Sequence, residues 1–220
     1  MEDKARKKLS AKQIILTLGV VLVGIVTVFA VRTNSGEKQN KIPPDEVKLI
    51  LSAKLTLDGN PISIVNKVLK VGDKVNFNFD LDVPVKTVEE QKTINASKFK
   101  GVRVIETVPS LDTPVCSMQT AELNLLAPEH KDVTFMVISQ DLPFAQSRYC
   151  GAKGVNKNVQ VLSDYRTKEF SKANGFLIHE NQLNARSITV VDKDDKVIYS
   201  EYAKEQSNGL DLSKALDALK

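Results

Sequence analysis

The sequence contains few of the residues that bind metals or cross-link a chain. Its 220 residues include two cysteines and two histidines. The histidines, His130 and His179, lie far apart, and this scattered set is too small for a zinc site. Neither Cys116 nor Cys150 belongs to a C-x-x-C pair, which argues against a thioredoxin-type disulfide exchanger.

The sequence also lacks a basic stripe with interleaved aromatic residues. The formal net charge is +4, but the excess is concentrated in one N-terminal cluster. That cluster consists of Lys4, Arg6, Lys7, Lys8 and Lys12. A nucleic-acid-binding domain would carry its basic residues on the folded surface. We therefore expect no nucleic-acid partner.

A long apolar run follows the basic cluster. Residues 14–31 carry no charge, and as a helix they would span about 27 Å, close to the thickness of a bilayer core. Thr17 and Thr27 do not form the polar stripe of a buried soluble helix. The positive-inside rule then leaves residues 1–13 in the cytoplasm. The pattern predicts a single-pass anchor in the cell membrane, with the rest of the chain extracytoplasmic.

A cleaved secretory signal is the alternative to an anchor. Residues 28–30 (VFA) offer small side chains where a signal peptidase would cut, and the product would be secreted. No cysteine follows the run closely, which disfavours a lipoprotein. Residues 32–46, with Pro43 and Pro44, are predicted to form a polar stalk.

Residues 47–220 are expected to form one α/β domain. Strands are expected at Lys54–Leu57, Ile62–Val65, Asn76–Leu81, Val102–Val108, Val133–Ser139, Val159–Leu162, Ser187–Val191 and Lys196–Glu201. Helices are expected at Val115–Leu126, Phe144–Gly151, Thr167–Asn174 and Leu210–Leu219. This order of elements predicts a layered α/β fold that is thioredoxin-like in plan.

The position of Cys116 favours reactivity. It follows a strand-ending turn and falls in the first turn of an expected helix, where free N–H groups and the helix dipole favour a thiolate. Thr113 can place a hydroxyl beside the sulfur or act as a plain N-cap, as can Asp112. Pro109 and Pro114 stiffen the loop and are expected to shape a small, dry pocket.

Cys150 follows a separate short helical segment. It can reach Cys116 only if one or both segments unwind, and such a partner suits a resolving role. A permanent structural disulfide remains the alternative outside the cytoplasm.

Four ordered segments resemble one protein family. Residues 108–116 (VPSLDTPVC) look like the peroxidatic motif of the peroxiredoxins. Residues 139–150 (SQDLPFAQSRYC) are similar to the resolving-cysteine segment of the bacterial thiol peroxidases, which are atypical two-cysteine peroxiredoxins. The other two are DGNP at 58–61 with VGDK at 71–74, and ARS at 185–187 leading into ITVVD at 188–192. The resemblance covers residues 53–220 and is far more specific than a lone T-x-x-C.

The resemblance implies a peroxiredoxin-type, thioredoxin-like fold and the reduction of hydrogen peroxide and organic hydroperoxides. It makes Cys116 the peroxidatic cysteine and Cys150 the resolving one. The two are expected to form an intramolecular disulfide during the reaction. Thr113 and Arg186 would be polar partners of the peroxide, and Pro109 would shield the thiolate. No cofactor is expected, because the sulfur itself carries the redox change.

The resemblance also implies partners. The family commonly forms homodimers and is reduced by thioredoxin, but its members are usually cytoplasmic. An exported domain would need a membrane or extracytoplasmic thioredoxin-like reductant instead. Two rivals stay open: a tethered thioredoxin-fold module with a structural disulfide, and a peroxide sensor. Arg186 as a plain surface charge is the matching alternative for that residue.

Overall fold

The computed structural model describes the backbone of residues 49–220 and the side chains from Leu55 onward. The expected basic segment (1–13), anchor (14–31) and stalk (32–46) lie outside the described residues. Within residues 49–220, no helix is both long enough and apolar enough to cross a bilayer.

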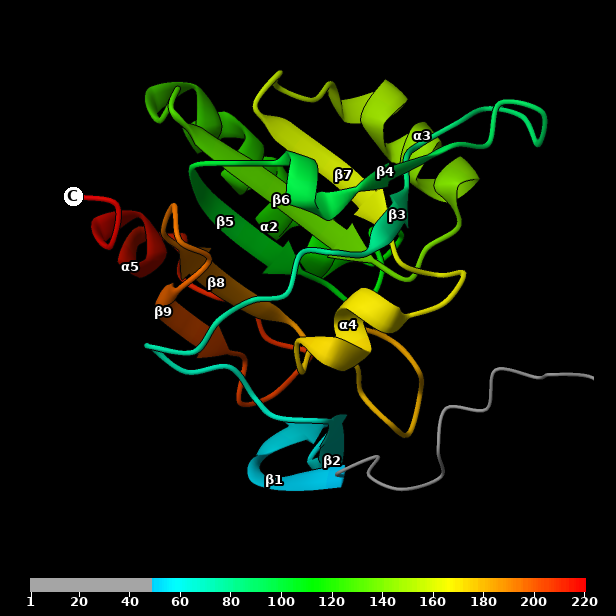
Figure 1. Cartoon of the computed structure of the whole chain (residues 1–220). Helices are drawn as coiled ribbons and strands as arrows, with labels where there is room; N and C mark the ends of the chain where they lie inside the picture. The colour runs from blue at the N-terminus through cyan, green and yellow to red at the C-terminus, as the bar shows by residue number, and fades with distance from the viewer. Residues whose placement is uncertain (1–48) are drawn as a thin grey trace, which may run out of the picture. The chain divides into compact units, whose positions relative to one another are not determined.

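A seven-stranded mixed sheet forms the centre of the domain (Figure 1). Its spatial order is β4-β3-β7-β6-β5-β8-β9. The central strands β5, β6 and β7 are parallel, while the strands on either side of them are antiparallel. The strands are β3 (Asp80–Asp82), β4 (Thr93–Asn95), β5 (Val102–Thr107), β6 (Val133–Ser139), β7 (Val159–Ser163), β8 (Ser187–Val191) and β9 (Val197–Tyr202).

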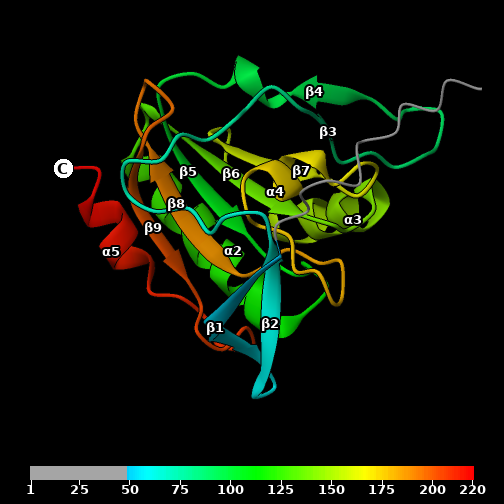
Figure 2. The same ribbon diagram turned by 60° about the horizontal axis from the view of Figure 1, so that its bottom comes forward.

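Helices cover both faces of this sheet (Figure 2). Two of them join the parallel strands: α2 (Pro114–Leu126) connects β5 to β6, and α3 (Pro143–Lys153) connects β6 to β7. The short helices are η1 (Ala96–Lys98), η2 (Ala127–Glu129), α4 (Glu169–Ala173) and α5 (Leu212–Asp217). This is the α/β, thioredoxin-like plan that the order of elements predicts.

Strand β6 shows why the sheet is covered on both sides. Its apolar run places Phe135 and Val137 in one cluster with residues of α2 and α5. Met136 and Ile138 point the other way, into a second cluster that contains Phe170 of α4. A continuous apolar run therefore marks a strand with two buried faces.

A separate hairpin precedes the sheet. Strands β1 (Leu49–Leu57) and β2 (Asn60–Val65) pair antiparallel around Asp58 and Gly59. Both turn residues have positive φ, 50° and 76°, as a tight Asp-Gly turn requires. The expected hairpin is confirmed, with a first strand longer than predicted.

One expected strand is largely absent. The sequence predicts a strand over Asn76–Leu81, but regular pairing begins only at Asp80. Burial alternates as expected, with Phe77 buried and Asn76 exposed. The Asn174 side chain bonds the Asn76 backbone instead: its Oδ1 accepts from the N–H at 2.8 Å and its Nδ2 donates to the carbonyl at 2.9 Å. A side chain thus takes the place of a neighbouring strand.

Two expected helices are shorter than predicted. The helix expected at 167–174 spans only Glu169–Ala173, and the terminal helix spans Leu212–Asp217. Gly175 follows α4 with φ +69°, the left-handed geometry expected of a residue just past a helix end. Strand β4 was not predicted.

Candidate active site

The site is built where β5 and β6 end. These parallel strands finish at the same edge, so the loops after them meet. Asp141, just after β6, joins the two loops with its carboxylate. Its Oδ1 accepts from Ser110 Oγ at 2.6 Å, and its Oδ2 accepts from the Leu111 N–H and from Ser139 Oγ, both at 2.8 Å.

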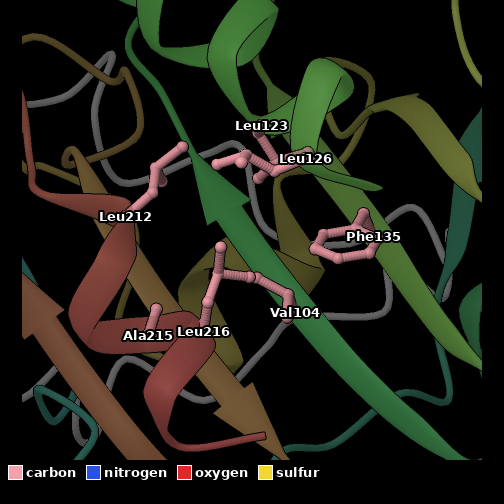
Figure 3. Close-up of a pocket in the computed structure, with 7 residues that line it drawn as sticks. All are labelled: Val104, Leu123, Leu126, Phe135, Leu212, Ala215 and Leu216. Atoms are coloured by element: carbon pink, nitrogen blue, oxygen red, sulfur yellow. The ribbon is translucent and has the colours of Figure 1, made fainter. Parts of the chain in front are cut away.

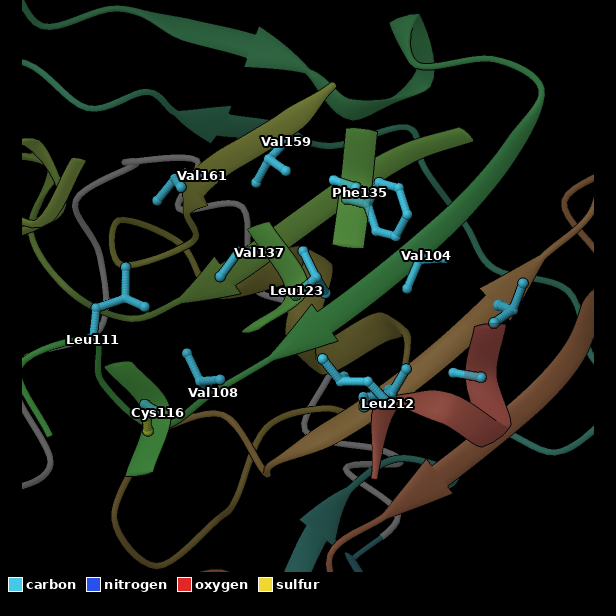
Figure 4. Packing of buried hydrophobic residues seen from close by; sticks show 14 of the residues in the cluster. Val104, Val108, Leu111, Cys116, Leu123, Phe135, Val137, Val159, Val161 and Leu212 are labelled. Atoms are coloured by element: carbon cyan, nitrogen blue, oxygen red, sulfur yellow. The ribbon is translucent and has the colours of Figure 1, made fainter. Parts of the chain in front are cut away.

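Cys116 occupies the third position of α2 and exposes none of its surface. It is one of the residues of the cluster between the sheet and α2 (Figure 4). The Thr113 hydroxyl lies 2.8 Å from its Sγ, and Arg186 Nη2 lies 3.2 Å from it. A hydroxyl and a guanidinium thus lie within hydrogen-bonding distance of one buried sulfur.

Thr113 does not act as a plain N-cap. It occupies the N-cap position of α2, but its side chain makes no capping hydrogen bond. The hydroxyl lies instead within bonding distance of the Ser110 carbonyl, at 2.9 Å, and of the Cys116 sulfur. With one proton it can donate to only one of them at a time.

Arg186 is buried, so its interpretation as a surface charge is wrong. Only 2% of it is exposed, directly before β8. Gln206 holds it twice: its carbonyl accepts from Arg186 Nε at 3.1 Å, and its Oε1 accepts from the Arg186 N–H at 2.5 Å. Among the described residues the buried Nη1 has no partner.

Cys150 lies in α3 beside the same cluster. It is half-buried, and burial raises the pKa of its thiol above the ordinary value. Both cysteines are free thiols. The neighbouring Tyr149 hydroxyl donates to the Ser117 carbonyl at 3.2 Å and so links α3 to the first turns of α2.

The remaining predicted residues lie around this centre. Pro109 is half-buried two residues after the end of β5, and its role as a shield stays a prediction. Pro114 begins α2 at the position where proline is best tolerated in a helix. Arg148, two residues before Cys150 in α3, has a side chain that is 71% exposed and lies 3.9 Å from Asp112.

Sequence reasoning missed Glu106. This carboxylate is fully buried in β5 and accepts from Gln119 Nε2 at 2.7 Å and from Thr120 Oγ1 at 3.0 Å. Burial raises its pKa to about 7, although these two bonds and the charge of Arg186 act in the opposite direction. The available signal was an acidic residue within a strand that is expected to be buried.

One small apolar cavity is not a ligand site. It measures about 10 Å³ and lies between α2, α5 and the sheet (Figure 3). That volume is at the lower limit for one water molecule, and every lining side chain is apolar. In the part of the chain that the structure describes, no three potential metal ligands cluster.

The fold and the cysteine site together define the class, a thioredoxin-like oxidoreductase. A family model described as Redoxin matches residues 70–219. The thiol peroxidase of Bacillus subtilis is 42% identical over 169 residues, which cover 76% of this chain and 97% of that protein. The thiol peroxidase of Halalkalibacterium halodurans is 41% identical over 172 residues, which cover 76% of this chain and 98% of that protein.

Two solved structures have the same fold as this chain. A peroxiredoxin-like protein from Aquifex aeolicus matches with a TM-score of 0.62 at 34% identity, covering 74% of this chain and 93% of that one. The thiol peroxidase from Chromobacterium violaceum shares the fold, with a TM-score of 0.64 at 20% identity. The match covers 75% of this chain and 94% of that one. The chain belongs to the thiol peroxidase family of peroxiredoxins and is a peroxiredoxin oxidoreductase.

Proposed function

We propose that this chain reduces hydrogen peroxide and organic hydroperoxides through a Cys116 sulfenic acid. The thiolate attacks the terminal peroxide oxygen, so that an S–O bond forms as the O–O bond breaks and water or an alcohol leaves. The observation that carries the proposal is the pair of donors, Thr113 Oγ1 and Arg186 Nη2, aimed at a buried sulfur.

The two polar partners have separate roles in this reaction. Arg186 stabilises the thiolate with Nη2, and its unpartnered Nη1 is free to stabilise the negative charge that develops on the leaving oxygen. The Thr113 hydroxyl holds the peroxide in line with the sulfur. Pro109 keeps water from the thiolate.

Cys150 completes the cycle. Its thiolate attacks the sulfenic sulfur, water leaves, and an intramolecular Cys116–Cys150 disulfide forms. Because Cys116 is fully buried and held by Thr113 and Arg186, the first turn of α2 has to open for this bond to form. An external dithiol then regenerates both thiols by exchange.

The test uses the full chain in detergent micelles with excess dithiothreitol. Consumption of hydrogen peroxide and cumene hydroperoxide is compared among the wild type, Cys116→Ser and Cys150→Ser. We expect Cys116→Ser to abolish turnover and Cys150→Ser to retain at least one turnover. No peroxide consumption by the wild type, with a disulfide that survives the reductant, would establish the structural-disulfide module instead. A slow cycle coupled to redox-dependent partner binding would establish the sensor.

The N-terminal segment suggests where this chemistry takes place. The uncharged run at 14–31 after a basic cluster supports a single-pass anchor with an extracytoplasmic catalytic domain. An extracytoplasmic thioredoxin-like protein is then the reductant, and two copies of the chain form a homodimer. Because the chain has only two cysteines, a membrane-impermeant maleimide applied to intact cells reports their side of the membrane. Labelling only after lysis would overturn this topology, and labelling in the medium alone would indicate cleavage.

A further inference from the structure

Glu106 is a buried ionisable group that the proposed reaction does not use. Its carboxylate is anchored entirely by α2, through Gln119 and Thr120. Gln119 also accepts from the Leu210 N–H at 2.9 Å, which ties the same turn of α2 to the C-terminal segment. A carboxylate that is fully removed from water exerts a strong effect on nearby charges, because few solvent dipoles screen it.

Helix and strand geometry bring Glu106 to the reactive sulfur. Gln119 and Thr120 lie three and four residues after Cys116, and such residues share one face of a helix. Their common acceptor therefore lies on the face of α2 that carries the sulfur.

The strand register also places Glu106 near Arg186. Glu106 pairs with Ile188 of β8, so Arg186, two residues earlier, is its diagonal neighbour on the same face of the sheet. Cα atoms in such diagonal pairs are roughly 7–8 Å apart. The sulfur, the guanidinium and the carboxylate therefore share one buried region.

We propose that Glu106 is a positioning residue that competes with the Cys116 thiolate for the charge of Arg186, and so couples the reactivity of the sulfur to a proton on the carboxyl group. The inference rests on the proposed role of Cys116. When both acids are ionised, two negative charges face one guanidinium. Repulsion between them disfavours that state, so a proton on Glu106 stabilises the thiolate.

The ionisable surroundings place this coupling in the neutral pH range. Burial raises the pKa of Glu106 to about 7, against the effects of Gln119, Thr120 and Arg186, and Glu122 raises it slightly further. Tyr149 of α3 also faces this carboxylate, but burial raises its pKa to about 12 and it stays neutral. Arg186 and Glu122 are then the charged groups that act on the Glu106 carboxylate.

The experiment measures the charge of the sulfur directly. In full-length protein carrying Cys150→Ser, alkylation of Cys116 by iodoacetamide is followed against pH, because only the thiolate reacts. Glu106→Gln is expected to lower the midpoint by roughly one pH unit, since it removes the opposing charge and keeps the shape. The matched control, Glu129→Gln, removes an exposed charge from the short helix η2 that follows α2 and is expected to leave the midpoint in place.

Coupling is reciprocal, which supplies a second test that does not depend on folding of the Glu106 variant. With ¹³C-labelled glutamate, the protonated Glu106 carboxyl is followed by infrared titration in the wild type and in Cys116→Ser. Removing the thiolate is expected to lower the Glu106 midpoint by the same amount. An unchanged midpoint in either experiment overturns the proposal. Neither readout requires peroxide turnover. A failure of the proposed function, which is tested by peroxide consumption, can therefore be distinguished from a failure of this inference.

Discussion

Arg186 Nη2 lies 3.2 Å from the sulfur of Cys116, although 70 positions separate the two residues in the chain. The sheet produces this contact. Strand β8 pairs antiparallel with β5, and Thr107 at the end of β5 faces Ser187 at the start of β8. The residue before β8 therefore meets the helix turn that follows β5. Arg186 therefore reaches the sulfur because β8 is paired with β5.

Replacing Arg186 with lysine should impair the peroxide reaction while leaving the fold intact. A lysine ammonium cannot bond Gln206, the sulfur and a peroxide oxygen at once, as a planar guanidinium can. We expect the second-order rate constant for peroxide reduction to fall by roughly 100- to 1,000-fold. Arg148→Lys, at a largely exposed position, is the control and should react normally. Equal rates for wild type and Arg186→Lys would remove Arg186 from the reaction.

The Thr113 hydroxyl is tested by an isosteric change. Thr113→Val keeps the shape of the side chain but removes the donor that lies 2.8 Å from the sulfur. We expect peroxide reduction to slow by about tenfold, which corresponds to one hydrogen bond to a charged group. Thr113→Ser retains the hydroxyl and should recover most of the rate. Loss of rate in both variants would point to packing instead.

Much of the fold could be predicted because local patterns agree with the final packing. The run at 133–139 is apolar on both faces because two clusters bury it. The Asp58-Gly59 turn follows directly from the need for positive φ. The strand expected over Asn76–Leu81 failed for a non-local reason: Asn174, distant in sequence, supplies its hydrogen bonds. No pattern within the segment contains that information.

Sequence patterns predicted some residues of the site and missed others. The position of Cys116 at a helix N-terminus is local, so sequence alone could indicate its reactivity. Arg186 was identified only through resemblance, because its contact depends on the pairing of β5 with β8. Glu106 was missed because its hydrogen-bond partners, Gln119 and Thr120, lie on a helix that follows the strand in sequence. Charged residues inside buried strands are the signal to follow.

Asp141 is expected to hold the loop before Cys116. Its carboxylate accepts three hydrogen bonds, two of them from Ser110 and Leu111 in that loop. Asp141→Asn replaces one acceptor oxygen with a donor, so we expect a loss of about 2 kcal/mol in free energy of unfolding and slower peroxide reduction. Urea titration and stopped-flow kinetics measure the two effects. Asp112→Asn, at an exposed position in the same loop, should change neither.

Gly175 is expected to tolerate no side chain. It has φ +69°, and an added Cβ would lie 1.9 Å from the Lys67 carbonyl oxygen, well inside contact distance. Gly175→Ala should therefore cost more than about 2 kcal/mol of stability, because backbone strain and a steric clash combine. Gly72 has φ +95° but no atom within 4 Å of such a Cβ, so Gly72→Ala isolates the strain alone. Equal melting temperatures for the two variants would show that the backbone at Lys67 moves to accommodate the added methyl group.

Glu205 should make the stability of the domain depend on acid pH. The Gly59 N–H and the Thr56 hydroxyl, with further backbone donors, lower its pKa from 4.5 to about 2 and fix the β1–β2 hairpin to the C-terminal segment. A carboxylate whose pKa is lower in the folded state stabilises that state above its unfolded pKa, and the effect disappears as pH falls through the folded value.

The difference in melting temperature between wild type and Glu205→Gln should therefore be largest above pH 4.5 and vanish near pH 2. Glu129→Gln, which removes an exposed charge elsewhere, should show no such window. A constant difference between wild type and Glu205→Gln across this range would mean that hydrogen-bond geometry, not the charge of Glu205, holds the hairpin in place.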